Sequence, residues 1–414
     1  MIKKIFSQYS GLKKSAYVLF IARLVTSMGS FIWPMLTLIL SIKLGYSESK
    51  IALIFLILAF IFFPATLIGG KLADRFNKKK IIIIFDIITV TFFFLSAIVE
   101  PGIMMLIFFT IAGLFATMEG PSHEALVVEA SLPKDREKIY SLTYLGHNLG
   151  FIIGAGLGGF LITNHLSLAF IIDGITTLMS TILIIMFVFP IKQEDIEEDN
   201  KNEYESEENH QDGLKVLKNR KPILLFILIT MITAFVYDQW VFIIPLYMTD
   251  IFGDINGPLF YGFIASFNGI MVIAATPIIT YLTRGKSEMP KIIIGTFLFS
   301  ISFLLVMYEP ILITFFSFVF LFTIGEVLKS ISTGPYVSRR IPSSHRGRIN
   351  SYVGLSSFTG IIVGKVMIGL VIDLTGYNTA LITIVILGII ATLLTMIKYK
   401  IDKKTFPNLY KNKA

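Results

Sequence analysis

Cysteine is absent from the 414 residues, tryptophan occurs only twice, and charged residues make up only 15% of the chain. Without cysteine there are no disulfide bonds and no thiolate ligands for a metal ion. With only five histidines, and no His, Asp and Glu cluster at ligand spacing, we expect no metal site. No Gly-x-x-x-x-Gly-Lys-Ser/Thr segment occurs, so no ATP site of the P-loop type and no cofactor are expected.

Hydrophobic residues make up 54% of the chain, and the mean hydropathy of +0.76 is far above that of soluble proteins. About 20 apolar residues cross a bilayer as a helix. Twelve such stretches predict an all-α integral membrane protein with twelve transmembrane helices, and not an enzyme. The expected spans are residues 15–42, 49–73, 80–99, 102–130, 139–163, 166–190, 222–249, 258–283, 290–308, 310–338, 347–374 and 377–399.

The basic residues predict the orientation of these spans. Lys and Arg number 36 against 28 Asp and Glu, a net charge of +8. Most of them fall in the two termini and in alternate loops, whereas the loops on the opposite side contain only Lys43 and Lys50. Because positive charge is retained in cytoplasmic loops, we expect both termini to be cytoplasmic. This topology accounts for the net charge, so no nucleic-acid partner is expected.

The two halves of the chain repeat each other, with an offset of about 210 residues. Residues that interrupt or end helices recur at this offset. A chance similarity between apolar stretches would not keep the offset so constant. Phe31–Pro34 recurs as Phe242–Pro245, Glu100-Pro101 as Glu309-Pro310, and Gly150 and Gly154 as Gly360 and Gly364.

This duplication predicts two pseudo-symmetric six-helix bundles related by an axis along the membrane normal. We expect the bundles at residues 1–190 and 222–414, the second with a short basic cytoplasmic tail. Residues 191–221 are acidic at first and then basic, and we expect them to form a disordered cytoplasmic linker. A regulatory or metal-buffering role is the alternative for this linker.

Residues 69–80 form a short charged turn between the second and third expected spans. Gly69 and Gly70 allow a close approach of backbones, and Asn77 tolerates the left-handed conformation of a tight turn. The spacing Gly-x-Leu-Ala-Asp-Arg-x-x-x-Lys resembles the signature loop between helices 2 and 3 of the major facilitator superfamily.

The resemblance implies the major facilitator fold and a conformational role for this turn. In the resembling family, an acidic residue at the end of helix 4 joins the Asp-Arg turn in a network that breaks on opening. Carried onto this sequence, the network consists of Asp74, Arg75 and Glu129, which we expect to be conformational switch residues and not ligands.

A glycine pattern in the fifth expected span carries a second resemblance. Small residues at this spacing let helix backbones approach closely, so plain helix packing is one interpretation. The pattern also resembles the motif of the twelve-span drug/proton antiporters, which favours export, although Ala155 stands where that motif has proline. The glycines are Gly150, Gly154, Gly158 and Gly159.

Two carboxylates lie near the centres of their spans, Asp238 in the seventh and Glu326 in the tenth. Burial favours the protonated form of a carboxyl group, so a proton can be held there and released when the site is wetted. Both are therefore candidates for proton coupling. A static ion pair is the alternative for Glu326, because Lys329 shares its helix face.

Three further charges lie at similar depth in the first half: Arg23, Asp86 and Glu119. One cation does not balance two carboxylates, so one acid is either protonated or faces water, and Glu119 is the better candidate for proton coupling. A static pair of Arg23 with Asp86 or Glu119 is favoured over substrate binding by Arg23. The antiporter branch usually has an arginine in helix 4, which this chain lacks, so Arg23 is a candidate for that role. His123 lies near that position.

The remaining cation within a span is Lys365, at the repeat position of Ala155. A buried lysine needs an anion. We expect that anion to be Glu326 or a carboxylate or phosphate of a substrate.

By resemblance, the protein is expected to be a monomeric, proton-coupled exporter of amphipathic small molecules that works by alternating access. The same resemblance implies a bacterial-type plasma (inner) membrane. A second hypothesis is a dedicated exporter or flippase of an endogenous anionic or zwitterionic metabolite, such as a peptide-like metallophore (siderophore) or a lipid. Arg23, Lys329 and Lys365 favour the second, as substrate-cavity charges. A nutrient importer is disfavoured by the glycine pattern, and a receptor or scaffold has little reason to keep carboxylates at mid-bilayer.

Overall fold

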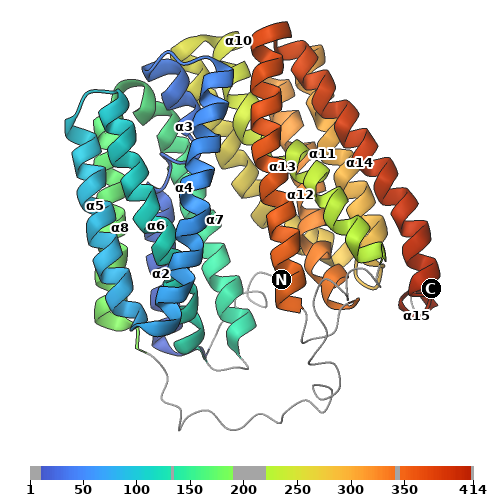
Figure 1. The fold of residues 1–414 in the computed structure, drawn as a ribbon, viewed down its shortest axis with the longest axis horizontal. Coiled ribbons are helices and arrows are strands. Elements are labelled where there is room, and N and C mark those ends of the chain that lie inside the picture. The colour runs from blue at the N-terminus through green and yellow to red at the C-terminus, as the bar shows by residue number, and fades with distance from the viewer. Residues whose placement is uncertain (1–10, 132–134, 190–220, 341–345, 412–414) are drawn as a thin grey trace. The chain divides into compact units, whose positions relative to one another are not determined.

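The computed structural model describes residues 11–131, 135–189, 221–340 and 346–411, and these contain helices and no strands (Figure 1). The predicted linker at 191–221 lies outside the described residues except for Lys221. The helices are α2 (Lys14–Gly29), α3 (Leu36–Leu38), the π-helix η1 (Ile39–Lys43), α4 (Glu48–Arg75), α5 (Lys78–Ile98), α6 (Ile103–Glu129), α7 (Arg136–Asn164), α8 (Leu166–Phe187), α10 (Lys221–Leu282), α11 (Glu288–Tyr308), α12 (Leu312–Ser338), α13 (Arg346–Thr375), α14 (Tyr377–Thr405) and α15 (Asn408–Lys411).

Ten helices in the described part of the chain are long and apolar enough to span a membrane, and two features relate this number to the twelve expected spans. The 62-residue α10 holds two expected spans, separated by Gly253 at φ 80°. The first expected span is interrupted after Gly29, and its second part is α3 followed by η1. Pro34 lies in this interruption, where a proline would remove a helical hydrogen bond. The twelve-helix architecture is therefore supported.

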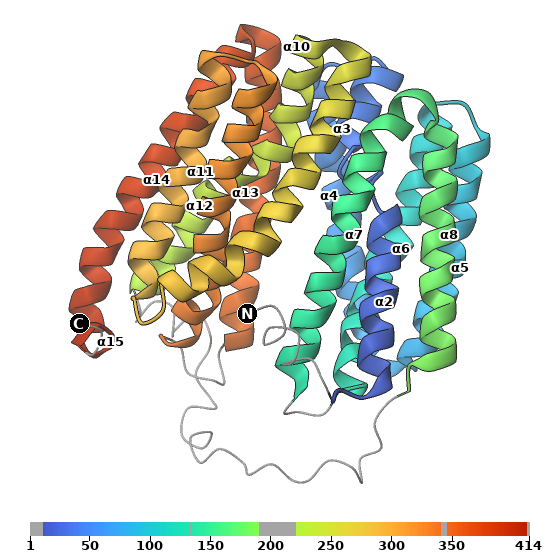
Figure 2. The ribbon, with the colours of Figure 1, turned by 180° about the vertical axis from the view of Figure 1, so that it is seen from behind.

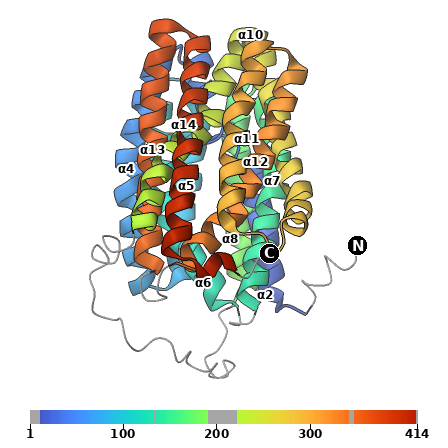
Figure 3. The ribbon, with the colours of Figure 1, turned by 90° about the vertical axis from the view of Figure 1, so that its right-hand side faces the viewer.

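The chain forms two compact units. The first unit comprises residues 1–46, 54–199 and 248–270, and the second comprises residues 47–53, 200–247 and 271–414. In the first unit, α5 packs against α6 and α8, and α2 packs against α7 and α8 (Figure 2). In the second unit, α11 packs against α12 and α14, and α13 packs against α14 (Figure 3).

Each unit contains a close helix contact at a glycine, and the two glycines are equivalent in the sequence repeat. A Cβ atom added to Gly150 of α7 would lie 2.4 Å from the carbonyl oxygen of Leu24 in α2. A Cβ atom on Gly360 of α13 would lie 2.0 Å from the carbonyl oxygen of Met231 in α10. The repeat read from the sequence therefore places equivalent glycines at equivalent helix crossings.

The other glycines of the fifth-span pattern pack α7 on two sides. Gly154 and Gly158 face α2 and the turn after it, where an added Cβ would lie 2.9 Å from the carbonyl oxygen of Met28 and 3.0 Å from Phe31 Cβ. Gly159 faces the part of α10 that belongs to the first unit, where the distance to the carbonyl oxygen of Pro258 would be 2.2 Å.

Gly159→Ala is therefore expected to destabilise the first unit, because the new methyl group needs the space of the Pro258 carbonyl oxygen. Overpacking of this kind costs about 1–3 kcal/mol. The measurement is the apparent melting temperature of the detergent-purified protein. Gly120→Ala in α6, where no atom lies within 4 Å of the added Cβ, is the matched control. Equal melting temperatures for the two variants would contradict the packing account.

The charged turn at 69–80 differs in part from expectation. Gly69 makes a close approach, since its Cβ would lie 2.4 Å from the carbonyl oxygen of Met118, whereas Gly70 faces open space. The left-handed conformation expected for Asn77 is wrong, because its φ is −66°. Asn77 instead caps α5, and its side chain accepts a hydrogen bond of 3.1 Å from the backbone N–H of Lys80.

Candidate functional sites in the two units

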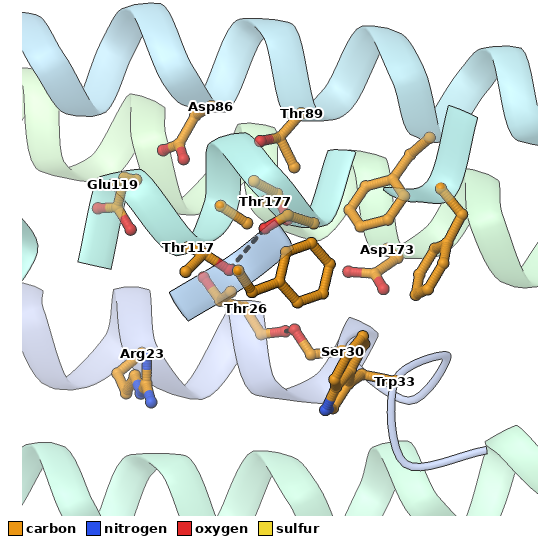
Figure 4. A pocket seen from close by; sticks show the side chains of 15 residues that line it. Arg23, Thr26, Ser30, Trp33, Asp86, Thr89, Thr117, Glu119, Asp173 and Thr177 are labelled. Atoms are coloured by element: carbon orange, nitrogen blue, oxygen red, sulfur yellow. Dashed lines mark hydrogen bonds between the residues drawn. The ribbon is translucent and has the colours of Figure 1, made fainter. Parts of the chain in front are cut away.

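The first unit contains a cavity of about 380 Å³, a volume within the range of small-molecule sites (Figure 4). Its lining comes from α2, α4, α5, α6, α8 and the turn that follows α2. Four of the lining side chains are ionisable: Arg23, Asp86, Glu119 and Asp173. The structure thus brings together the three charges that the sequence placed at similar depth, and adds a fourth.

Arg23, Asp86 and Glu119 lie at one end of this cavity (Figure 4). Asp86 accepts a hydrogen bond of 2.5 Å from the hydroxyl of Thr181 in α8. Within the described ranges Arg23 forms no ion pair, so its expected static pair with Asp86 or Glu119 is not formed. Depth along the bilayer predicts that these side chains lie near one another, but it does not reveal which of them form ion pairs.

Arg23 also lines a second cavity, of about 180 Å³, in the first unit. His123 and His147 line the same cavity, and His147 Nδ1 lies 2.9 Å from the hydroxyl oxygen of Ser27. His123 is therefore near Arg23 in space, and the two residues considered for the missing helix-4 arginine share one cavity.

Asp173 of α8 was missed by the sequence analysis. It is only 4% exposed and lies at the other end of the larger cavity, with Ser30 and Trp33 (Figure 4). Thr181, the partner of Asp86, lies eight residues further along α8, which is about 12 Å of helix. The signal was present in the sequence, since an acid within an expected span was the criterion that identified Asp238 and Glu326.

In the second unit, Lys365 of α13 forms an ion pair with Asp238 of α10. The two side chains are 7% and 13% exposed. The Lys365 ammonium group also lies 5.7 Å from the ring centre of Phe242. The anion expected to pair with Lys365 was Glu326 or a carboxylate or phosphate of a substrate, and the ion pair that the structure shows is with Asp238.

Glu326 of α12 accepts a hydrogen bond of 2.7 Å from the hydroxyl of Tyr237 in α10. Lys329 donates a hydrogen bond of 2.9 Å to Thr233, so in the described structure it does not form the static pair considered for it with Glu326. The two side chains share a helix face but contact different residues of α10.

The predicted switch residues in the first unit are not assembled as expected. Glu129 at the end of α6 pairs with Lys78, at 2.9 Å, while Asp74 and Arg75 are exposed. The acidic end of α6 therefore does reach the charged turn, but its partner is the first residue of α5 rather than Arg75.

A buried ionic cluster in the second unit was also missed. The Arg340 guanidinium binds both carboxylate oxygens of Asp402, at 2.8–3.0 Å, and both side chains are fully buried. Tyr336 donates to Asp402 over 2.8 Å, and Arg340 donates to the hydroxyl of Tyr410 over 2.9 Å. Burial and the Asp402 carboxylate raise the pKa of Tyr410, which therefore stays protonated. Arg340 and Asp402 both lie outside the expected spans, so no criterion based on charges within spans could find them.

An all-α chain with membrane-spanning helices in two units, each with buried ionisable side chains, has the architecture of a multi-pass membrane transporter. The family model of the Major Facilitator Superfamily matches residues 18–328 and 258–413, and the chain belongs to this superfamily. Its homologues and structural neighbours are transporters and not enzymes.

Three curated relatives illustrate this membership. The MFS-type transporter YttB of Bacillus subtilis (strain 168) is 21% identical over 372 residues, covering 89% of this chain and 90% of YttB. A Na(+), Li(+), K(+)/H(+) antiporter of Planococcus maritimus is 23% identical, with coverage of 83% and 87%. The multidrug resistance protein MdtH of Yersinia enterocolitica (serotype O:8 / biotype 1B, strain NCTC 13174 / 8081) is 26% identical over 147 residues, covering 35% of this chain and 37% of MdtH.

Solved structures show the same fold at low sequence identity. A mutant of the nucleoside transporter NupG superposes with a TM-score of 0.74 at 14% identity, covering 93% of this chain and 99% of NupG. A mutant of the peptide transporter POT in complex with sulfate gives a TM-score of 0.75 at 15% identity, with 94% of both chains covered.

Proposed function

We propose that the protein is a proton-coupled secondary active transporter that exports amphipathic small molecules by alternating access. The observation that carries this proposal is the hydrogen bond from Tyr237 to Glu326 inside the second unit. The hydroxyl group of Tyr237 is neutral and can bond to either protonation state of a carboxyl group, so the Glu326 side chain can gain or lose a proton as its surroundings are dried or wetted. A carboxylate of this kind is what proton coupling needs.

Asp238 and Glu119 have supporting roles in this proposal. Protonation of Asp238 would remove the counter-charge of Lys365, so uptake of a proton would weaken the contact between α10 and α13. Glu119 would take a proton in the cavity of the first unit, where Asp86 adds a second negative charge. Each proton would thus change a charge balance inside a bundle, which links protonation to conformation.

The names of two relatives support export in exchange for protons. One is named a multidrug resistance protein and another a Na(+), Li(+), K(+)/H(+) antiporter.

The proposal also includes the domain organisation and the location of the protein. The protein would be a monomer with bundles at 1–190 and 222–414, a linker at 191–221, and cytoplasmic termini in a bacterial inner membrane. Asp74, Arg75 and Glu129 would act as the switch, with Glu129 exchanging Lys78 for Arg75 between states.

The test is uptake of a fluorescent lipophilic cation into inside-out membrane vesicles that contain the protein. With an inside-acid pH gradient, an exporter should accumulate the dye in the vesicle lumen, and a protonophore should abolish the accumulation. Accumulation that persists after collapse of the pH gradient would contradict proton coupling. Vesicles without the protein serve as the control.

The alternative function is export or flipping of an anionic or zwitterionic metabolite. Arg23 favours it, because this cation lines two cavities and forms no ion pair in the described ranges. Lys365 no longer favours it, since its partner is Asp238.

Arg23→Gln separates these two functions. Export of organic cations should be retained, because the substitution removes a repulsive charge from the cavity, whereas export of an anion bound by Arg23 should fall at least about tenfold. The assay is the initial rate of vesicle uptake for one cationic and one anionic dye, with the exposed Lys71→Gln as the matched control. A tenfold loss of cation uptake in Arg23→Gln would contradict the proposed cation exporter.

A further inference from the structure

Asp173 is a buried carboxylate that takes no part in the proposed mechanism. It is 4% exposed, and among the described residues no side chain or backbone group donates a hydrogen bond to its carboxylate. Figure 4 shows this carboxylate directed into the cavity of the first unit. A buried charge without a partner is unfavourable by several kcal/mol. The cavity must therefore supply a cation or a proton.

Aromatic rings surround this end of the cavity. The ring centre of Trp33 lies 5.6 Å from that of Phe62 and 6.0 Å from that of Phe109, and Phe93 lies 6.4 Å from Phe109. All four residues line the cavity. The faces of such rings attract organic cations, and rings around an ammonium group are an established arrangement for binding quaternary amines.

The end of α2 adds a further preference for positive charge. The 16-residue helix ends at Gly29, and Ser30, which follows it, lines the cavity. The last carbonyl groups of a helix carry a partial negative charge. Three features therefore favour a positively charged ligand: the helix C-terminus, the carboxylate and the ring faces.

A hard inorganic cation fits this end less well. No group of three or more His, Cys, Asp or Glu with the arrangement of a metal site occurs in the described part of the chain. Hard cations are bound by several oxygen ligands at short distance, usually including more than one carboxylate, whereas Asp86 and Glu119 lie at the other end of the cavity from Asp173. The cavity volume of about 380 Å³ also suits an organic group.

We propose that Asp173 is the anionic partner of an organic ammonium group, which binds in the first unit among the rings of Trp33, Phe62 and Phe109. Arg23, Asp86 and Glu119 lie at the other end of the cavity, so the three carboxylates outnumber the single cation. This inference rests on the proposed export of amphipathic molecules and names a subsite for the charged group. Equilibrium binding tests it without transport, so the two can fail separately.

The protein offers a reporter for this test, because it has only two tryptophans and one of them lines the cavity. The Trp240→Phe variant leaves Trp33 as the sole tryptophan. Its fluorescence is titrated with phenyltrimethylammonium and, as the matched probe of opposite charge, with benzenesulfonate. We expect a saturable change with the ammonium compound and none with the sulfonate.

Asp173→Asn in the same background should weaken phenyltrimethylammonium binding at least tenfold, while Glu100→Gln, an exposed acid between α5 and α6, should leave it unchanged. Equal affinity with and without the Asp173 carboxylate would overturn the proposal. If Asp173→Asn does not fold, the comparison of phenyltrimethylammonium with benzenesulfonate in the Trp240→Phe protein still tests the proposal. Equal responses to both probes, or no saturable response to the ammonium compound, would overturn it.

Discussion

Asp402→Asn is expected to lower the free energy of unfolding by about 3–5 kcal/mol, because the buried Arg340 guanidinium loses the carboxylate that it binds through both oxygens and keeps only the Glu288 carboxylate, 3.7 Å away. The side chains of Arg340 and Asp402 are fully buried, so water cannot replace the lost partner. The amide also keeps only one of the two oxygens to which Tyr336 and Tyr410 donate, which loosens the contact between α12 and the C-terminal α15. The measurement is thermal unfolding of the purified protein in detergent.

A double variant separates the ion pair from general packing. Arg340→Met combined with Asp402→Leu removes both charges, and replacing a whole buried pair by apolar residues is often neutral or stabilising. The double variant should therefore be more stable than Asp402→Asn alone. Lys404→Gln, an exposed change near the end of α14, should have no effect. Unchanged stability of Asp402→Asn would contradict the role given to the cluster.

Glu326→Gln is expected to abolish the response of substrate transport to a pH gradient. The amide keeps the shape of the side chain and can still accept a hydrogen bond from Tyr237, but it cannot carry a proton. Exchange of labelled for unlabelled substrate should persist, because substrate binding does not need this proton. The measurement compares gradient-driven uptake with exchange in reconstituted vesicles.

The matched control for this variant is Glu309→Gln, a carboxylate outside the spans, between α11 and α12. It should retain both gradient-driven uptake and exchange. Full gradient-driven uptake in Glu326→Gln would assign the proton to another carboxylate. Asp238→Asn is then the next variant, since it removes the partner of Lys365.

The architecture could be read from the sequence because its signals do not depend on which side chains meet. Span length follows from the run of apolar residues, and the glycine repeat follows from a constant offset along the chain, with Gly150 and Gly360 at equivalent crossings. The break after Gly29 also coincides with Phe31–Pro34, a segment that the repeat analysis singled out. The two helices joined in α10 were separable because Gly253 interrupts the helix at the expected loop.

The ion pairs could not be read in the same way. Lys365 forms an ion pair with Asp238, a partner that the sequence did not indicate, because the rotation of each helix about its axis decides which residues meet. Depth in the membrane, which spacing does predict, places Arg23, Asp86 and Glu119 around one cavity, but it does not predict that Arg23 forms no ion pair within the described ranges. Glu129 pairs with Lys78 because side-chain reach selects among several cations in one turn.

The most direct test of the account is proton movement triggered by substrate in proteoliposomes with a pH-sensitive dye in the lumen. Addition of a lipophilic cation to the wild-type protein should move protons in the direction opposite to the substrate, and Glu326→Gln should abolish this movement. Substrate transport at the wild-type rate without any proton movement would contradict proton-coupled export.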